Sequence, residues 1–118
     1  MKLSEVIDKY RALFDDGRLP YTKCNNCSHV FYYARSSCPK CQSADLDIRT
    51  SSGHGTIYSV TGLLDKNKRE TYYSIIEMDE GFRLYSTVIS ESAPEIGDSV
   101  SVTVINVNGK NYPFFKKT

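Results

Sequence analysis

Four cysteines in two closely spaced pairs constrain this chain of 118 residues more than any other feature. They form two C-x-x-C motifs with ten residues between them: Cys24 with Cys27, and Cys38 with Cys41. Two intervening residues allow the backbone to fold into a tight knuckle with both sulfurs on one side, and the spacer is long enough for a hairpin that brings the knuckles face to face. We therefore predict that all four cysteines bind one structural metal ion.

Zinc is the metal that this pattern favours, because four thiolates in a closed site are a common structural zinc arrangement. Iron in a rubredoxin-like site uses the same ligands, so the sequence leaves iron open. A site closed by four sulfurs has no open coordination position, so it supports the fold and does not catalyse. Disulfides would instead require an oxidising compartment. Residues 1–8 carry acids where a secretory signal needs an apolar run, and we expect a cytoplasmic protein with no membrane association.

An amphipathic helix is predicted over residues 3–16. Ser4 is expected to cap its start and Gly17 to end it. Its apolar side chains recur at i, i+3 and i+4 spacing and form one face: Leu3, Val6, Ile7, Tyr10, Leu13 and Phe14. Such a face packs either on its own domain or on another subunit, and the sequence favours the first.

The rest of the chain is predicted to be mainly β-structure. Short strands at 21–23, 30–33 and 46–49 would build a rubredoxin-like ribbon around the cysteines, and a turn-rich segment follows at 51–55. Five further strands are expected at 56–64, 71–78, 82–90, 100–104 and 111–117, with a polar loop at 65–69, an Asn108-Gly109 hairpin turn and Pro113 at an edge or bulge. They favour an OB-fold barrel, with an SH3-like barrel as the alternative. We predict three parts: an N-terminal helix (1–18), a zinc ribbon (19–50) and an OB-fold barrel (51–118).

No catalytic constellation is evident. His29 and His54 are the two histidines, and neither belongs to a recognisable catalytic motif. The net charge of +1 and pI of about 7.6 argue against a dedicated nucleic-acid binder, which is usually more basic. A single-stranded nucleic-acid-binding OB-fold protein nevertheless stays as the alternative function, because tyrosines stack on bases and the chain has nine, among them Tyr72, Tyr73 and Tyr85.

Cationic side chains are the candidates for ligand binding. Lys66, Lys68 and Arg69 lie in the loop that joins the first two barrel strands, one of the loops with which OB-folds bind ligands. They can hold the phosphates of CoA or of a nucleic acid, or they can simply be solvated. Arg35, beside the second knuckle, is a candidate contact to CoA or to a partner, with a hydrogen bond to the ribbon backbone as the alternative.

Several segments together resemble a known family. They are Cys24 and Cys27, then Arg35 before Cys38-Pro39-Lys40-Cys41, then the segments 53–61, 77–84 and 96–100. In this order they resemble the zinc-ribbon and OB-fold proteins first catalogued as a domain of unknown function and later called acyl-CoA-associated. The resemblance covers essentially the whole chain. Many members have glycine after the second cysteine of a knuckle, where this chain has Ser28 and Gln42, and proline where it has Ala34.

The resemblance implies a non-catalytic accessory subunit rather than an enzyme. Members of this family are partners of thiolase-like, synthase-like or hydratase-like enzymes, and they are thought to hold CoA thioesters or to bridge two active sites. It therefore implies a zinc-binding partner of an acyl-CoA enzyme, with CoA or acyl-CoA as the shared ligand. Which enzyme and which acyl group are involved is not encoded in these motifs.

Overall fold

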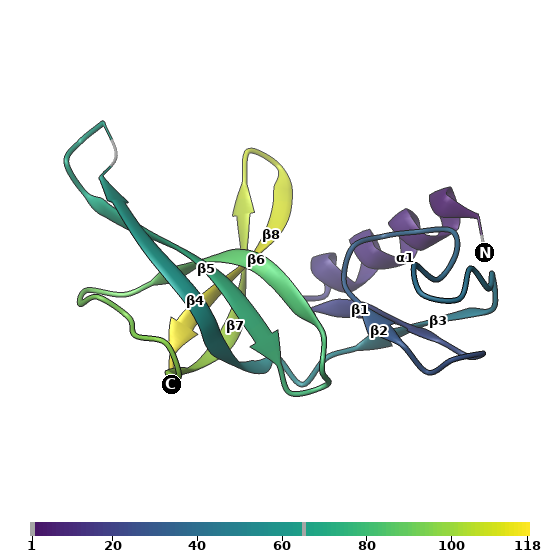
Figure 1. Ribbon diagram of the computed structural model, residues 1–118. Helices are drawn as coiled ribbons and strands as arrows, with labels where there is room; N and C mark the ends of the chain where they lie inside the picture. The colour runs from purple at the N-terminus through teal and green to yellow at the C-terminus, as the bar shows by residue number, and fades with distance from the viewer. Residues whose placement is uncertain (1, 65) are drawn as a thin grey trace.

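One helix, a three-stranded ribbon and a closed five-stranded barrel make up the chain in a computed structural model that describes residues 2–64 and 66–118 (Figure 1). The predicted fold class is confirmed. Met1 and Asp65, which the predictions placed in the N-terminal segment and in the polar loop 65–69, lie outside the described residues. Within those residues, no helix has the length and apolar character needed to cross a membrane.

The helix α1 spans Leu3–Asp15. Its N-cap is Lys2, whose extended backbone (φ −70°, ψ 144°) precedes the first turn and whose carbonyl accepts the first helical hydrogen bonds. The prediction that Ser4 caps the helix is wrong, because the helix begins before it. At the other end Gly17 adopts φ +75° and its amide bonds to the Phe14 carbonyl, so glycine ends the helix as predicted.

Part of the apolar side of α1 packs on the chain itself, whereas Leu3 and Ile7 stay exposed. Val6 and Tyr10 are buried, and α1 lies against the ribbon and against the last barrel strand. The Tyr10 and Thr22 hydroxyls are 2.7 Å apart in a buried hydrogen bond. Burial raises the pKa of Tyr10 to about 12, although the bond to Thr22 opposes the shift, so this phenol stays neutral at physiological pH. The Asn111 side chain donates to Asp15 over 2.7 Å and ties the C-terminal end of the helix to the barrel.

The ribbon consists of three short strands in the order β2-β1-β3: β1 Pro20–Cys24, β2 Val30–Phe31 and β3 Leu46–Thr50. β2 is shorter than the predicted 30–33 because the next two tyrosines turn to the barrel. The ring of Tyr32 stacks with that of Phe82 at a centroid distance of 6.3 Å. The Tyr33 hydroxyl accepts a hydrogen bond of 3.2 Å from the Tyr85 amide.

The barrel closes in the order β4-β5-β6-β8-β7, and β7 pairs back with β4. Its strands are β4 His54–Leu64, β5 Glu70–Met78, β6 Arg83–Ile89, β7 Ser99–Val107 and β8 Lys110–Lys117. β6 and β8 run parallel and all other neighbours run antiparallel, which is the arrangement of an OB-fold. Pro113 pairs with Val104 on β7, whereas β6 pairs with β8 only from Phe115 onward. The proline thus occupies an edge-like part of β8, where its missing N–H costs no ladder bond.

One hydrophobic core joins the ribbon to the barrel. Leu19, just before β1, and Tyr21 of β1 belong to the same buried cluster as the inward residues of the barrel, and Tyr21 stacks on Phe82 at 4.9 Å. Glu80, in the β5–β6 turn, fixes the segment 51–53 that connects ribbon and barrel. Its carboxylate accepts hydrogen bonds from the Ser51 hydroxyl (2.6 Å) and from the Ser52 backbone N–H (2.8 Å). β3 ends and β4 begins on either side of residues 51–53. The division of the chain into 1–18, 19–50 and 51–118 stays a prediction.

Candidate metal centre

Two backbone knuckles of the same geometry present the four cysteines. In the first, the Ser28 amide bonds to the Cys24 carbonyl at 3.0 Å. In the second, the Gln42 amide bonds to the Cys38 carbonyl at 2.8 Å. Ser28 and Gln42 have φ angles of 64° and 65°, the left-handed conformation that glycine adopts without strain. The glycine position noted in related sequences is therefore a conformational requirement that this chain meets with two L-residues.

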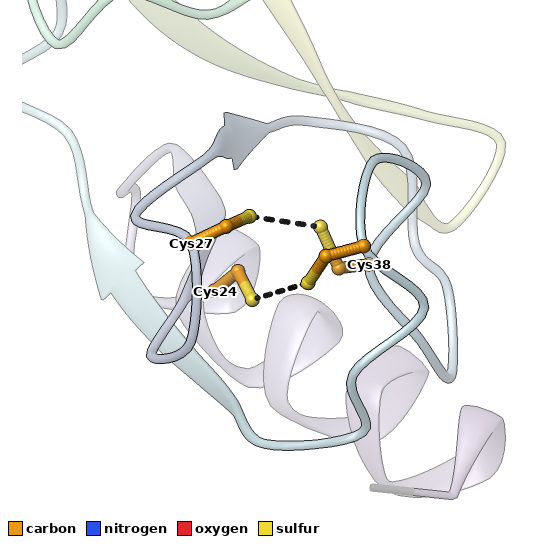
Figure 2. A group of neighbouring side chains, drawn as sticks. Cys24, Cys27 and Cys38 are labelled. Atoms are coloured by element: carbon orange, nitrogen blue, oxygen red, sulfur yellow. Dashed lines mark hydrogen bonds between the residues drawn. The ribbon is translucent and has the colours of Figure 1, made fainter.

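The four sulfur atoms converge on one point, as Figure 2 shows for Cys24, Cys27 and Cys38. All four lie within 4.8 Å of one another. The Cys24–Cys41 and Cys27–Cys38 sulfur distances are 3.5 Å and 3.6 Å. A tetrahedron of thiolates around zinc, with bonds of about 2.3 Å, has edges of about 3.8 Å. The sulfurs therefore fit a tetrahedral metal ion, with Cys24 and Cys38 buried and the other two partly exposed.

The thiols of this cluster ionise unequally. A hydrogen bond from the Asn26 side chain, helped by one from the Ser43 backbone, lowers the pKa of Cys41 to about 6. A backbone hydrogen bond from His29 lowers the pKa of Cys27, but desolvation and the neighbouring thiols outweigh it and raise that pKa to about 11. Four thiolates this close repel one another, so full ionisation needs a bound cation.

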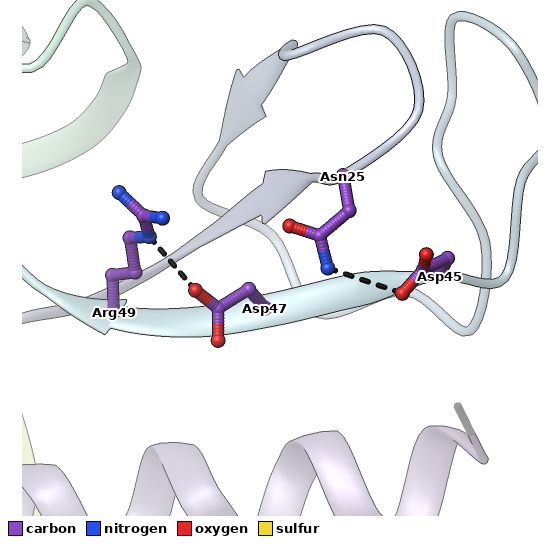
Figure 3. Close-up of polar contacts among 4 residues, drawn as sticks. All are labelled: Asn25, Asp45, Asp47 and Arg49. Atoms are coloured by element: carbon purple, nitrogen blue, oxygen red, sulfur yellow. Dashed lines mark hydrogen bonds and ion pairs between the residues drawn. The ribbon is translucent and has the colours of Figure 1, made fainter.

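Asparagines in the first knuckle support the cluster, and the sequence reasoning missed them. The Asn25 side chain donates to the Asp45 carboxylate at 3.1 Å (Figure 3). The Asn25 backbone N–H donates to the Asp45 carbonyl at 3.0 Å. These bonds tie the first knuckle to the segment that follows the second. The Asn26 side-chain amide donates a hydrogen bond to the Cys41 sulfur at 3.5 Å. Amide donors placed between paired cysteines are the signal that could have identified them, because a thiolate accepts such bonds.

Figure 3 also shows Arg49 donating to Asp47 at 2.8 Å, two residues away on β3. This pair is about half exposed, so it contributes little to stability. His29 stacks on Phe31 at 5.8 Å, and His54 is exposed at the start of β4. Across residues 2–64 and 66–118, the four cysteines are the one group of His, Cys, Asp or Glu side chains arranged to hold an ion.

The cationic candidates do not form one site on this chain. Arg35 is exposed in the ribbon loop before the second knuckle. Lys66, Lys68 and Arg69 are exposed in the β4–β5 loop. That loop and the ribbon lie at opposite ends of the molecule, whose longest extent is 45 Å (Figure 1).

Comparisons with known proteins agree with this architecture. Residues 11–47, which include all four cysteines, match the family model described as "ChsH2, rubredoxin-like zinc ribbon domain". A "DUF35 domain-containing scaffold protein" from Methanothermobacter thermautotrophicus is 30% identical over 108 residues, which cover 85% of this chain and 81% of the relative. The chain belongs to the DUF35 family. A scaffold protein of the same description from Methanocaldococcus jannaschii is 30% identical over 90 residues, covering 71% and 64% of the two chains.

Solved DUF35 structures share the fold of the whole chain. A chain of the structure described as "Ltp2-ChsH2(DUF35) aldolase" superposes with a TM-score of 0.80 at 21% identity, covering 93% of this chain and 92% of that one. A DUF35 protein of unknown function from Sulfolobus solfataricus superposes with a TM-score of 0.71 at 14% identity, covering 94% and 84%. The ribbon and the barrel therefore have the same relative arrangement across widely diverged sequences. The family assignment confirms the resemblance inferred from the sequence motifs.

Proposed function

We propose that this chain is a non-catalytic accessory subunit that binds zinc, associates with a thiolase-like or other acyl-CoA enzyme and helps to bind or channel CoA thioesters. The observation that carries the proposal is the match, over most of its length, to DUF35 scaffold proteins. The aldolase description of the Ltp2-ChsH2(DUF35) neighbour adds support for an enzyme as the partner, and it leaves the kind of enzyme open among thiolase-like, synthase-like and hydratase-like partners.

The metal centre has a structural role in this proposal. Cys24, Cys27, Cys38 and Cys41 would hold the ion, which when bound supplies a cross-link between the two knuckles. The residues around it keep that cross-link in register, because Asn25 bonds to Asp45 across the two knuckles. No coordination position is left for a substrate, so the ribbon positions its neighbours and does not carry out chemistry.

The two groups of cations then serve different contacts. We assign Lys66, Lys68 and Arg69 to the phosphates of CoA, because an exposed cationic loop at one end of an OB barrel makes charge-assisted bonds to anions without much desolvation. We assign Arg35 to the partner enzyme, because it is exposed in the ribbon loop and not in the cationic β4–β5 loop. The accessory subunit would thus hold the thioester beside the enzyme and reduce the entropic cost of bringing reactants together.

The test is to purify the tagged chain from its native host at moderate salt, identify what co-purifies and measure the metal content. We expect an acyl-CoA enzyme in near-stoichiometric amount and one zinc per chain by elemental analysis. Iron in place of zinc would correct the metal and leave the subunit role intact. Nucleic acid or ribosomal proteins that persist after nuclease treatment, with no acyl-CoA enzyme, would contradict the proposal.

A further inference from the structure

The outer face of β4, β5 and β6 bears an unusual set of side chains. Along β5, Tyr72, Ser74 and Ile76 are buried, so the residues between them point outward. The strand register puts Tyr73 beside Thr61 and Thr87, and Ile75 beside Ser59 and Tyr85. We call these six outward positions the tyrosine face: Ser59, Thr61, Tyr73, Ile75, Tyr85 and Thr87.

The tyrosine face carries no charge and exposes large apolar side chains. Tyr85 is 72% exposed and Tyr73 is 51% exposed, with a groove of about 470 Å³ between them. Leu63 and Ile89 extend it at one end, at 55% and 42% exposed. Water-facing sheet surfaces usually carry polar or charged residues at such positions, so a face of this composition marks an interaction site.

The ribbon holds this face in place. The Tyr33 hydroxyl accepts the Tyr85 amide proton on the side of β6 away from β5, and the two rings lie 6.4 Å apart. Tyr32 in turn packs on Phe82, just before β6. A rigid aromatic anchor loses little conformational entropy on binding, which suits it to a protein interface.

The charge distribution favours a protein over a nucleic acid as the occupant. OB-folds do bind oligonucleotides on this face, but such a face needs cations that neutralise phosphates. The six positions carry no cation, and Arg83, two residues before Tyr85 on β6, pairs with Glu77 at 3.8 Å and lies 3.9 Å from the centre of the Tyr58 ring. Lys116, which the register places beside Ile89, lies at the other end of the face. Protein interfaces, in contrast, are depleted in charge at their centre and enriched in tyrosine.

We infer that the tyrosine face is the surface by which this chain docks on its acyl-CoA enzyme, with Tyr73 and Tyr85 as the anchors that enter an uncharged, apolar patch of that enzyme. This inference rests on the proposed function and names its interface. The helix α1 is the lesser candidate, because Val6 and Tyr10 are already buried against the chain itself.

The experiment uses the full-length chain and the purified enzyme that co-purifies with it. Hydroxyl-radical footprinting compares the labelling of tyrosines in the free chain and in the complex, and titration calorimetry measures the Kd of Tyr73→Ser and Tyr85→Ser. The matched control is Tyr112→Ser, because Tyr112 is 44% exposed and lines a separate groove beside α1. We expect protection of Tyr73 and Tyr85, at least tenfold weaker binding by each variant, and a change of less than twofold in the control.

Each contrary outcome is distinct. If the enzyme binds but Tyr73 and Tyr85 stay labelled and their variants bind normally, the interface is elsewhere and the proposed function stands. Loss of binding in Tyr112→Ser alone would place the interface beside α1. Sedimentation that shows a dimer of this chain, abolished by Tyr85→Ser, would assign the face to a second copy. Salt-dependent binding of a labelled oligonucleotide that requires Tyr73 and Tyr85 would assign it to nucleic acid. If no acyl-CoA enzyme binds the wild-type chain, the inference and the proposed function fail together.

Discussion

Replacing Ser28 and Gln42 with glycine should stabilise the ribbon, because both residues hold a left-handed backbone. An L-residue in that conformation costs about 1–2 kcal/mol relative to a right-handed one. Glycine removes this strain but gives the unfolded chain more freedom, which costs about 0.5–1 kcal/mol. The net gain is about 0.5–1 kcal/mol for each site. Both side chains are exposed, so their removal sacrifices no buried contact.

The two gains should add, because the substitutions lie in different knuckles. The double variant is expected to gain about 1–2 kcal/mol, which for a chain of this length raises the Tm by about 4–8 °C. Urea unfolding and calorimetry should be run at a fixed excess of zinc, because a bound metal adds its own stabilisation. Zinc content measured in parallel shows whether all the variants are equally loaded.

Two controls separate backbone strain from other effects. Ser28→Ala removes the hydroxyl but keeps an L-residue, so it should bring no gain. Ser36→Gly places glycine in the same loop at a residue without a positive φ, so it should lower the stability. The reasoning would be refuted if Ser28→Gly were no more stable than Ser28→Ala, or if Ser36→Gly gained as much.

Three further predictions concern the metal site and the junction between ribbon and barrel. Cys38→Ser should abolish stoichiometric zinc in elemental analysis, because a hydroxyl is a much poorer ligand than a thiolate. Gly53→Ala should destabilise the fold by about 2 kcal/mol or more in urea unfolding, because the residue has φ +84° and a β-carbon would lie 2.8 Å from Val102 Cγ1. Glu80→Gln should cost about 1 kcal/mol at pH 7, since its partly exposed carboxylate is screened by water. Desolvation opposes the shift, but hydrogen bonds from residues 51–52 lower the pKa of Glu80. The stabilisation is therefore complete above the unfolded pKa of about 4.3 and disappears as the pH falls through the folded pKa, so wild type and variant should converge in acid.

The metal cluster and the order of the elements could be predicted from the sequence because both depend on short-range spacing. Two residues between cysteines define a knuckle whatever the rest of the chain does, and the structure brings the four sulfurs within 4.8 Å. The alternation of apolar and polar residues predicted the barrel strands to within a few residues. The one error at a helix end, a cap predicted at Ser4 and found at Lys2, is also local, because several residues near a helix start can serve as its cap.

The tertiary structure decided which side chains are buried and which distant segments meet. Tyr72 and Tyr73 are neighbours in the sequence and were both candidates for stacking on bases, yet β5 buries the first and exposes the second. Tyr33 leaves the predicted strand because its hydroxyl meets the Tyr85 amide 52 residues further on. The ribbon, whose loop carries Arg35, and the cationic β4–β5 loop lie at opposite ends of the molecule. Local periodicity follows from backbone geometry within a few residues, whereas the meeting of distant segments depends on how complete elements pack, and no short pattern encodes that packing.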